Sequence, residues 1–276
     1  MGWKRGYDSI DTVHKSAPQK GPRRFYVPAK ETKQVLFLED QPTVFWEHQF
    51  KFNGHWRNWL PCNKNNTEGQ ERCFICEKYT KSFPGTVGLF SVINLTPWEF
   101  TNREGRVLRF CYQREILTAR MGSVSRPGTL QELQRLRGMT ENKSLHGVIM
   151  ECYRSGDKTE AVGDKLSIKT QVPVDKIEEF GHAKVRAFLA EINKSMAPDR
   201  QLNFAEHIEK HPWQPFDFDK LIVPMPYERQ RKMYGWDSAP DEPPQTSTPH
   251  PADSPAYDAM VDDYSTGGYS DEEIPF

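Results

Sequence analysis

A group of potential metal ligands in the first third of the chain constrains the fold more than any other feature. His48 is followed after 13 residues by Cys62, and after ten more by Cys73 and Cys76, which form a Cys-x-x-Cys pair. One histidine and three cysteines can complete a tetrahedral site, which is typical of structural Zn²⁺ and leaves no position for a catalytic water. We therefore predict one structural zinc ion, Zn2+, held by a small zinc subdomain at about residues 46–82.

Two alternatives to this ligand set remain open at the level of sequence. His55 could replace His48, but it directly follows the turn signal Asn53-Gly54, where side chains tend to face solvent, so His48 is favoured. The Cys-x-x-Cys pair could instead be redox-active, although no βαβ pattern surrounds it. Cys111 and Cys152 lie in apolar strand patterns, and we expect them in the core.

The charges of the chain are unevenly distributed. The 276 residues include 37 Lys and Arg and 38 Asp and Glu, a formal net charge of −1. Residues 235–276 hold ten of the acidic residues and no Lys or Arg, so residues 1–234 have 37 basic against 28 acidic residues, a net charge of +9. The segment 235–276 is also rich in Pro, Ser and Gly, and it is predicted to be a disordered acidic tail. The chain thus combines a basic body with an interaction segment of opposite charge.

Membrane insertion and secretion are not expected for this chain. No apolar run approaches the roughly 20 residues that a spanning helix needs, and residues 1–20 lack the apolar stretch of a signal peptide. An odd number of cysteines, five in all, fits metal ligation in a reducing compartment better than a disulfide framework. We therefore predict a cytoplasmic protein with no membrane partner.

The hydrophobic pattern is mainly that of short strands. A hairpin is indicated by the Asn-Gly turn between two aromatic runs. Strands are predicted at 35–38, 44–52, 88–95, 106–112, 148–153 and 165–170, and helices at 129–137 and 175–196. This pattern indicates a β-rich (β plus α) fold, with a small barrel rather than a parallel sheet and accessory helices. Three regions follow: a flexible basic N-terminal arm (1–33), a core (34–234) that includes the zinc subdomain, and the tail (235–276).

Aromatic and basic residues alternate in two stretches, 45–59 and 103–114. Single-stranded nucleic acid requires this combination, because bases stack on flat rings and cations neutralise the phosphates. Most of these rings could equally build the core. The candidate contacts for single-stranded DNA are Lys51, Trp56, Arg57, Trp59, Arg106, Arg109, Phe110, Tyr112 and Arg114.

The segment 48–56, followed by the three cysteines of the ligand set, resembles the zinc-containing single-stranded DNA-binding (helix-destabilising) proteins of T-even-type phages. In that family a His, a Phe-Lys-x-Asn-Gly-x-Trp hairpin, a Cys and a later Cys-x-x-Cys occur in this order, and the match covers roughly residues 33–170. The resemblance implies an oligonucleotide-binding (OB-fold) barrel with an inserted zinc subdomain. It also implies DNA contact for Lys51 and Trp56, stacking for Phe110 and Tyr112, and zinc on His48, Cys62, Cys73 and Cys76.

Both ends of the chain add to the resemblance. Near the N-terminus, Lys4 and Arg5 are similar to the basic motif by which that family binds cooperatively along a strand, which implies self-association on DNA.

The other end resembles the tip of bacterial single-stranded DNA-binding proteins, where acidic residues precede Ile-Pro-Phe and a free carboxylate. An apolar pocket on a partner protein can bind the Phe276 ring, and basic residues at the rim of that pocket can bind the acidic side chains. A merely solubilising tail is the alternative. The candidate partner-binding residues are Asp271, Glu272, Glu273, Ile274, Pro275 and Phe276.

We therefore predict a non-enzymatic protein that coats and protects single-stranded DNA during replication, recombination and repair, and recruits partner enzymes through its tip. If it is phage-encoded, it would act in the cytoplasm or nucleoid of the bacterial host. A zinc-dependent deaminase is disfavoured, because no His-x-Glu lies upstream of Cys73, and no carboxylate cluster suggests a two-metal nuclease. A zinc-ribbon RNA-binding or transcription-adaptor protein is the alternative.

Overall fold

The computed structural model describes residues 22–52, 55–66, 72–80, 83–101, 107–123, 125–156, 159–194 and 201–235. Where residues 51–59 and 100–109 lie in strands, it describes their backbone only. Lys4, Arg5, Arg106 and the partner-binding residues predicted at 271–276 lie outside the described residues, as does the segment 236–276 predicted to be disordered.

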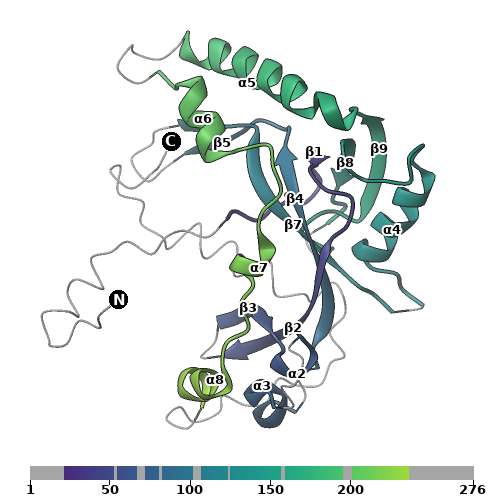
Figure 1. Cartoon of the computed structure of the whole chain (residues 1–276), viewed down its shortest axis with the longest axis vertical. Coiled ribbons are helices and arrows are strands. Elements are labelled where there is room, and N and C mark those ends of the chain that lie inside the picture. Colours follow the sequence, from purple (N-terminus) through teal and green to yellow (C-terminus); the bar gives the residue numbers. More distant parts are fainter. Residues whose placement is uncertain are drawn as a thin grey trace, which may run out of the picture.

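An antiparallel sheet of seven strands forms the centre of the molecule (Figure 1). Its strands are β1 (Thr32–Phe37), β2 (Thr43–Phe52), β3 (His55–Pro61), β4 (Gly85–Asn94), β7 (Gln113–Arg120), β8 (Val148–Tyr153) and β9 (Lys165–Gln171). Along the sheet the order is β3-β2-β4-β1-β8-β9, with β7 on the other edge of β4. A separate two-stranded sheet consists of β5 (Trp98–Thr101) and β6 (Val107–Phe110).

Strand β4 connects the two halves of this sheet. Its first half pairs with β2, from Glu47 opposite Gly85 to Thr43 opposite Leu89. Its second half pairs with β1 on the same edge, ending with Val35 opposite Asn94. The other edge pairs with β7 over residues 87–94. β4 therefore carries the β2–β3 hairpin at one end and the β1–β8–β9 strands at the other.

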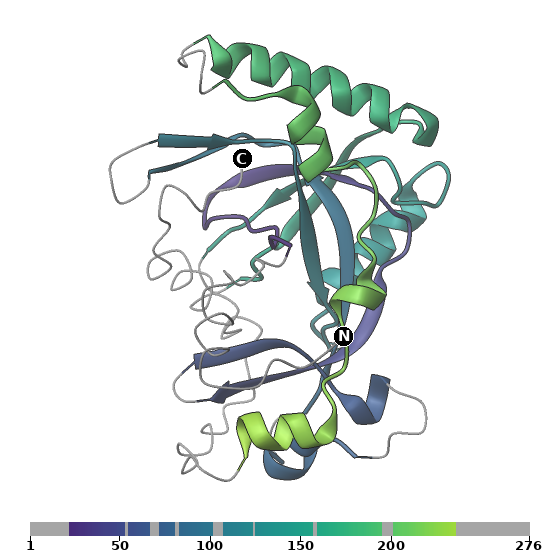
Figure 2. The ribbon, with the colours of Figure 1, turned by 60° about the vertical axis from the view of Figure 1, so that its left-hand side comes forward.

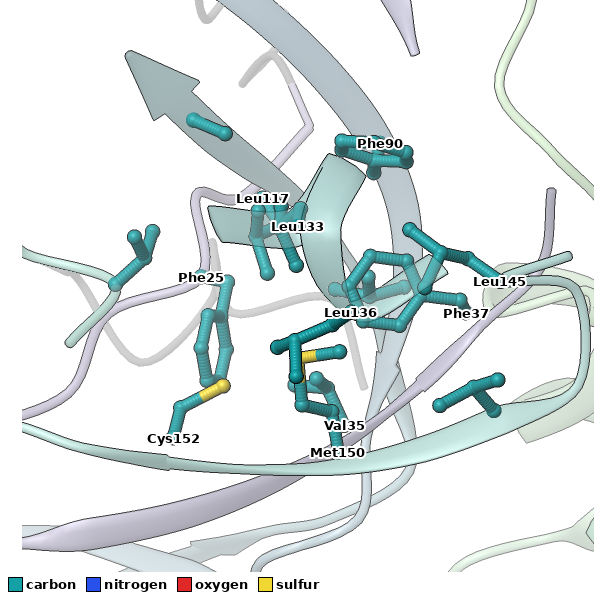
Figure 3. Packing of buried hydrophobic residues seen from close by; sticks show 14 of the residues in the cluster. Phe25, Val35, Phe37, Phe90, Leu117, Leu133, Leu136, Leu145, Met150 and Cys152 are labelled. Atoms are coloured by element: carbon teal, nitrogen blue, oxygen red, sulfur yellow. The ribbon is translucent and has the colours of Figure 1, made fainter. Parts of the chain in front are cut away.

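Successive residues of β1 enter different cores, because side chains alternate between the two faces of a strand. Val35 and Phe37 belong to the larger cluster of buried apolar residues, on the face covered by α4 (Thr129–Met139), which contributes Leu133 and Leu136 (Figure 3). Leu36 faces the opposite side and packs in the cluster that α5 (Ile177–Asn193) completes. The body of the protein is thus a sheet with α4 on one face and α5 on the other.

The C-terminal part of the chain crosses the α5 face of the sheet as a segment that we call the strap, residues 211–235. Before it lies α6 (Phe204–Lys210), and within it lie α7 (Phe218–Leu221) and α8 (Tyr227–Tyr234). Phe218 packs with Phe45 and Leu89 of the sheet. The strap ends beside the two short helices α2 (Asn63–Asn66) and α3 (Phe74–Lys78), far from α5 (Figures 1 and 2).

The predicted closed barrel is wrong. A barrel closes when its edge strands pair with each other, but among the described residues β9 pairs with β8 and β3 pairs with β2. In the part of the chain that the structure describes, the segment before β1 forms one isolated parallel bridge, between Arg24 and Ile116 of β7, and this bridge does not close the sheet. The mainly antiparallel, mixed α and β character is confirmed.

Two further boundaries differ from the sequence prediction. The predicted arm, 1–33, extends too far, because Phe25 and Val27 are buried in the larger core and the backbone of Phe25 bonds to β7. The single strand predicted at 106–112 is interrupted at Tyr112, whose φ of 52° turns the chain from β6 into β7. Strands β5 and β7 are not among the predicted strands, whereas the remaining predicted strands and both predicted helices are present.

Candidate metal centre and nucleic-acid interface

The four predicted metal ligands come together from three elements that meet at the end of the β2–β3 hairpin. His48 lies in β2, Cys62 directly follows β3, Cys73 precedes α3, and Cys76 lies within it. Their donor atoms all lie within 4.8 Å of one another. Among the described residues, this is the group of histidine, cysteine and carboxylate side chains with the geometry to hold a metal ion.

The separations between donor atoms are close to the edges of a tetrahedron around Zn²⁺. With Zn–S of about 2.3 Å and Zn–N of about 2.0–2.1 Å, tetrahedral geometry requires about 3.8 Å between two sulfurs and about 3.6 Å between nitrogen and sulfur. The Sγ atoms of Cys62 and Cys76 are 3.6 Å apart, and His48 Nε2 lies 3.4 Å from the Sγ of both Cys73 and Cys76. The donor set and its spacing therefore fit a single tetrahedral ion.

Hydrogen bonds within the protein position the backbone around the ligands without the help of an ion. The backbone N–H of Cys62 donates to the carbonyl of Trp46, 2.8 Å away. The side-chain amide of Asn66 bonds to both backbone groups of Trp46 and to the carbonyl of Cys62. A register shift in the β2–β3 pairing falls between His48 and Phe50. Since a bulge re-aims a side chain, this shift helps to direct His48 at the cysteines.

The electrostatics of the cluster favour a bound cation. Burial opposes ionisation of Cys73, but the hydrogen bond from His48 and two backbone N–H groups outweigh it and lower the pKa of Cys73 to about 6. Burial raises the pKa of Cys76 to about 12, and the neighbouring sulfurs of Cys62 and Cys73 raise it further. Burial likewise raises the pKa of Cys62. Three thiolates this close repel one another, and a divalent ion removes that penalty.

The cluster is largely enclosed. His48 and Cys62 are fully buried, Cys73 is nearly so, and Cys76 is half-buried. A small apolar cluster surrounds them, with Phe50, Leu60, Phe74, Ile75 and Tyr234. A closed site with four protein donors suits a structural ion. We call this cluster and the elements around it, residues 46–80 together with α8, the metal module.

The alternatives left open by the sequence can now be compared with the geometry. His48, and not His55, belongs to the metal-binding group. All five cysteines are free thiols, so the Cys-x-x-Cys pair forms no disulfide here. Cys111 and Cys152 are buried, as predicted for core residues, and burial raises the pKa of each to about 12.

A second site lies on the β5–β6 hairpin. Trp98 and Phe110 are paired across its strands, and their rings stack with centroids 4.4 Å apart and planes 16° apart. The guanidinium of Arg23 lies 3.8 Å from the Trp98 ring centre. Arg23 also donates to Gln113 and pairs with the buried Glu115, at 3.7 Å. A stacked pair of rings with a cation over it is the combination that single-stranded nucleic acid requires.

Two cationic residues that precede or begin the sheet are largely buried. Burial lowers the pKa of Arg24 to about 10, with Glu47 opposing the shift. Burial also lowers the pKa of Lys33, with Glu115 opposing it. Cations held in poorly hydrated surroundings gain more from an anionic partner than cations in bulk water. Glu47 and Glu115 are partners of this kind within the protein.

The predicted DNA contacts divide into three groups. Phe110 is in the second site, on the stacked pair. Tyr112 packs edge-on against Phe188 of α5, and burial raises its pKa to about 12; its role in stacking on bases stays a prediction. Arg114 donates to the carbonyl of Gln214 and covers Phe216, which gives it a structural role in holding the strap.

The remaining predicted contacts lie in strands whose side chains are not described. Lys51 is paired with Trp56 in the backbone register of the β2–β3 hairpin, which confirms the hairpin itself. Arg57 and Trp59 lie in β3, and Arg109 lies in β6. The β2–β3 and β5–β6 hairpins extend from the same side of the sheet (Figure 2).

Sequence reasoning missed two groups of residues that the structure brings to these sites. Trp98 was not among the predicted contacts, although the Trp-Glu-Phe pattern of β5 is a signal for a strand with aromatic residues on one face. Gln230 and Asn63, both fully buried, hydrogen-bond to each other beside Cys73. Their polar sequence surroundings carry no signal for burial.

Comparison of the sequence with protein-family models and with curated proteins gives no match. Among the helices of the described residues, none has the length and apolar character needed to cross a membrane. Functional conclusions about this chain therefore depend on its own residues and their geometry.

Proposed function

We propose that this protein binds single-stranded DNA without catalysing a reaction, and that the metal module is a structural zinc site supporting the β2–β3 hairpin. The observation that carries the proposal is the stacked pair Trp98–Phe110 with Arg23 over it. Rings that stack on bases and cations that track phosphates are what sequence-independent binding of a single strand uses. The OB-fold remains our interpretation of the curved antiparallel sheet.

The arrangement of the two hairpins supports an extended interface. One hairpin carries Trp98 and Phe110, and the other carries Lys51 and Trp56 in its strands. Both extend from the same side of the molecule (Figure 2). A single strand that contacted both hairpins would follow the segment that includes Arg23 and Arg24, which is hydrogen-bonded along β7.

The acidic segment belongs to the proposal as a recruiting and competing element. Ten acidic residues and no Lys or Arg occupy 235–276, against a net charge of +9 on the rest of the chain. We propose that the segment competes with DNA for the basic interface and that Ile274-Pro275-Phe276 binds replication, repair or recombination enzymes. Deleting 265–276 is expected to leave or increase DNA affinity and to abolish recruitment. A truncation that loses DNA binding but keeps partners contradicts this assignment.

Trp98→Ala tests the proposed interface most directly. Because base–aromatic stacking contributes about 1–3 kcal/mol per base, we expect oligo(dT) affinity to fall about 5- to 150-fold. Fluorescence anisotropy over a salt series measures the change, and log K should fall by about 0.7 per log[salt] for each phosphate neutralised. Phe83→Ala, which alters a ring that is 83% exposed outside this site, is the matched control.

The outcomes of this experiment are distinct. Equal affinity of the Trp98→Ala and parent proteins, or binding that does not depend on salt, overturns the interface. Tighter binding of a matched RNA than of the DNA favours the zinc-ribbon RNA-binding alternative, since proteins distinguish the two through the 2′-hydroxyl.

A further inference from the structure

Helix α8 places a buried glutamine against the metal centre. Gln230 is fully buried, and its Oε1 accepts a hydrogen bond from the Cys73 Sγ, 3.6 Å away. Its Nε2 donates to Oδ1 of the equally buried Asn63, at 3.2 Å. Asn63 directly follows Cys62 and donates in turn to the carbonyl of Met225, at 2.8 Å. One polar chain therefore connects two metal ligands to the start of α8.

The rest of α8 packs against residues that are close in sequence to the metal ligands. Tyr227 packs edge-on against Phe74 and donates to Glu77, at 2.6 Å. At the other end of the helix, Tyr234 packs against Phe50, and its carbonyl accepts a hydrogen bond from Tyr79, at 3.0 Å. Both ends of α8 thus contact the segment 48–80 that the ion would organise.

Neither side of this contact is expected to be stable alone. α2 has four residues, α3 has five and α8 has eight. Isolated helices shorter than about 12–15 residues are marginal in water, because nucleation fixes several residues for each hydrogen bond gained. The apolar cluster here is small, and it includes two of the metal ligands themselves, Cys62 and Cys73.

The strap can release α8 without disturbing the body. Its upper part is anchored on the sheet, where Phe218 packs with Phe45 and Phe216 donates its N–H to Ser91, at 2.8 Å. Between α7 and α8 lie residues 222–226, which have no helix or strand. Loss of the lower contact would therefore free α8 and leave the upper anchor in place.

We propose that α8 is a metal-dependent latch, which docks on the metal module when His48 and the three cysteines hold a cation, with Gln230 as the positioning residue for Cys73. The proposal rests on the metal-binding part of the proposed function. Groups that bond to metal ligands orient them and are typically worth 10–100-fold in metal affinity. With the ion bound, Cys73 is a thiolate and cannot donate, so the Gln230 amide must turn and present Nε2 to the sulfur. Metal loading then fixes the position of Gly235, which follows α8.

The first test compares the full-length zinc protein before and after removal of the ion by a chelator. Hydrogen exchange measured by mass spectrometry should show loss of protection in residues 227–234 and 73–79, while β4 and β8 stay protected. Unchanged protection of α8 in a sample shown to have lost its zinc overturns the latch. A preparation that never binds zinc overturns both the latch and the metal centre, and its metal content distinguishes this result from failure of the latch alone.

The second test changes Gln230 and leaves the ligands intact. Gln230→Met keeps the volume but removes both hydrogen bonds, so we expect a 10–100-fold loss of zinc affinity in a competition with a chromophoric chelator. In the Co²⁺-substituted protein, the thiolate-to-metal charge-transfer band should shift, which a purely packing role for Gln230 would not produce. Met233→Ala, on the exposed face of the same helix, is the matched control. Parent-like zinc affinity and spectrum in Gln230→Met remove the positioning role.

Discussion

The metal module and the body of the protein are held together by different means. In the body, sixteen buried residues form the larger core between α4 and the sheet, and a second core of ten lies under α5. In the metal module the buried cluster has seven residues, of which two are metal ligands. We expect the body, with its larger apolar cores, to be stable without an ion, and the module to depend on one.

This contrast explains why the two regions differ in their polar interiors. In the body the buried polar residues lie on different elements, such as Glu115 of β7, which pairs with Arg23 and Asn94, and Arg154 after β8. The module buries a histidine, cysteines and two amides around one point. Such a group is costly to bury unless every member is bonded. A cation bound by His48 and the three cysteines would satisfy four of these buried groups at once and offset the cost of burying them.

Removal of the metal ligands should have the largest effect, because it should unfold the metal module and leave the body folded. Structural zinc sites contribute apparent binding free energies of about 10–16 kcal/mol, so Cys73→Ser or His48→Ala should abolish zinc content and unfold the module. Calorimetry together with metal analysis should show the body transition retained. Cys152→Ala is the matched control, because it alters a buried cysteine of the body and should keep one zinc per chain. Cys73→Ser protein with full zinc content and an unchanged melting profile contradicts the comparison.

Leu133→Ala should have the opposite pattern. Leu133 is buried in the larger core, and truncation of a buried leucine costs about 2–5 kcal/mol. We expect the midpoint of the body transition in urea to fall, while zinc affinity measured by chelator competition stays at the parent value. A comparable loss of zinc affinity would mean that the two regions unfold as one unit.

Gly181→Ala tests the upper end of the strap. A Cβ at this position of α5 would lie 2.5 Å from the ring of Trp213, so the ring must shift. Overpacking of this kind costs about 1–3 kcal/mol. Urea unfolding should report this loss in the body transition, and hydrogen exchange should show weaker protection of α6 with α8 unaffected. Equal loosening of α8 would show that the strap docks as a single element.

Asp40→Asn should have the smallest effect, and one that depends on pH. Arg137 donates two hydrogen bonds to Asp40, and these hold the pKa of its carboxyl well below its ordinary value. The carboxylate therefore stabilises the fold above about pH 4, and this contribution is lost progressively as the pH falls below that value. We expect Asn to cost about 1 kcal/mol at pH 7, with the difference shrinking at pH 3. A difference in urea midpoint that persists unchanged at pH 3 would contradict the assignment.

The ligand set could be predicted from sequence because metal chemistry restricts both residue type and spacing. Once Cys62 and the Cys-x-x-Cys pair were recognised, a histidine within a strand was the natural fourth donor, and His48 is the one in the cluster. Strands β1, β2, β4, β8 and β9 were equally accessible, since their apolar residues are continuous or alternate. Local pattern was sufficient for these features.

Features that depend on distant contacts could not be predicted. Gln230 lies in the sequence Tyr-Glu-Arg-Gln-Arg-Lys-Met-Tyr, which is typical of a solvated helix, and its burial depends on contact with Asn63, 167 residues away. Tyr112 lies in a basic-aromatic run, but the turn at its backbone directs the ring toward α5. Barrel closure depends on pairing between edge strands, which short-range periodicity does not specify.

The shared strand β4 also determines how the spacing of the two hairpins can change. β4 has ten residues, about 33 Å at about 3.3 Å per residue, and it pairs with β2 at one end and leads to β5 at the other. The hairpins are thus attached to one continuous ladder and not to a hinge. Lengthening β4 by one residue without a bulge would turn the later side chains of β4 to the opposite face and so move them between the α4 and α5 cores. Without a bulge, the spacing therefore changes by two residues at a time, in steps of about 7 Å.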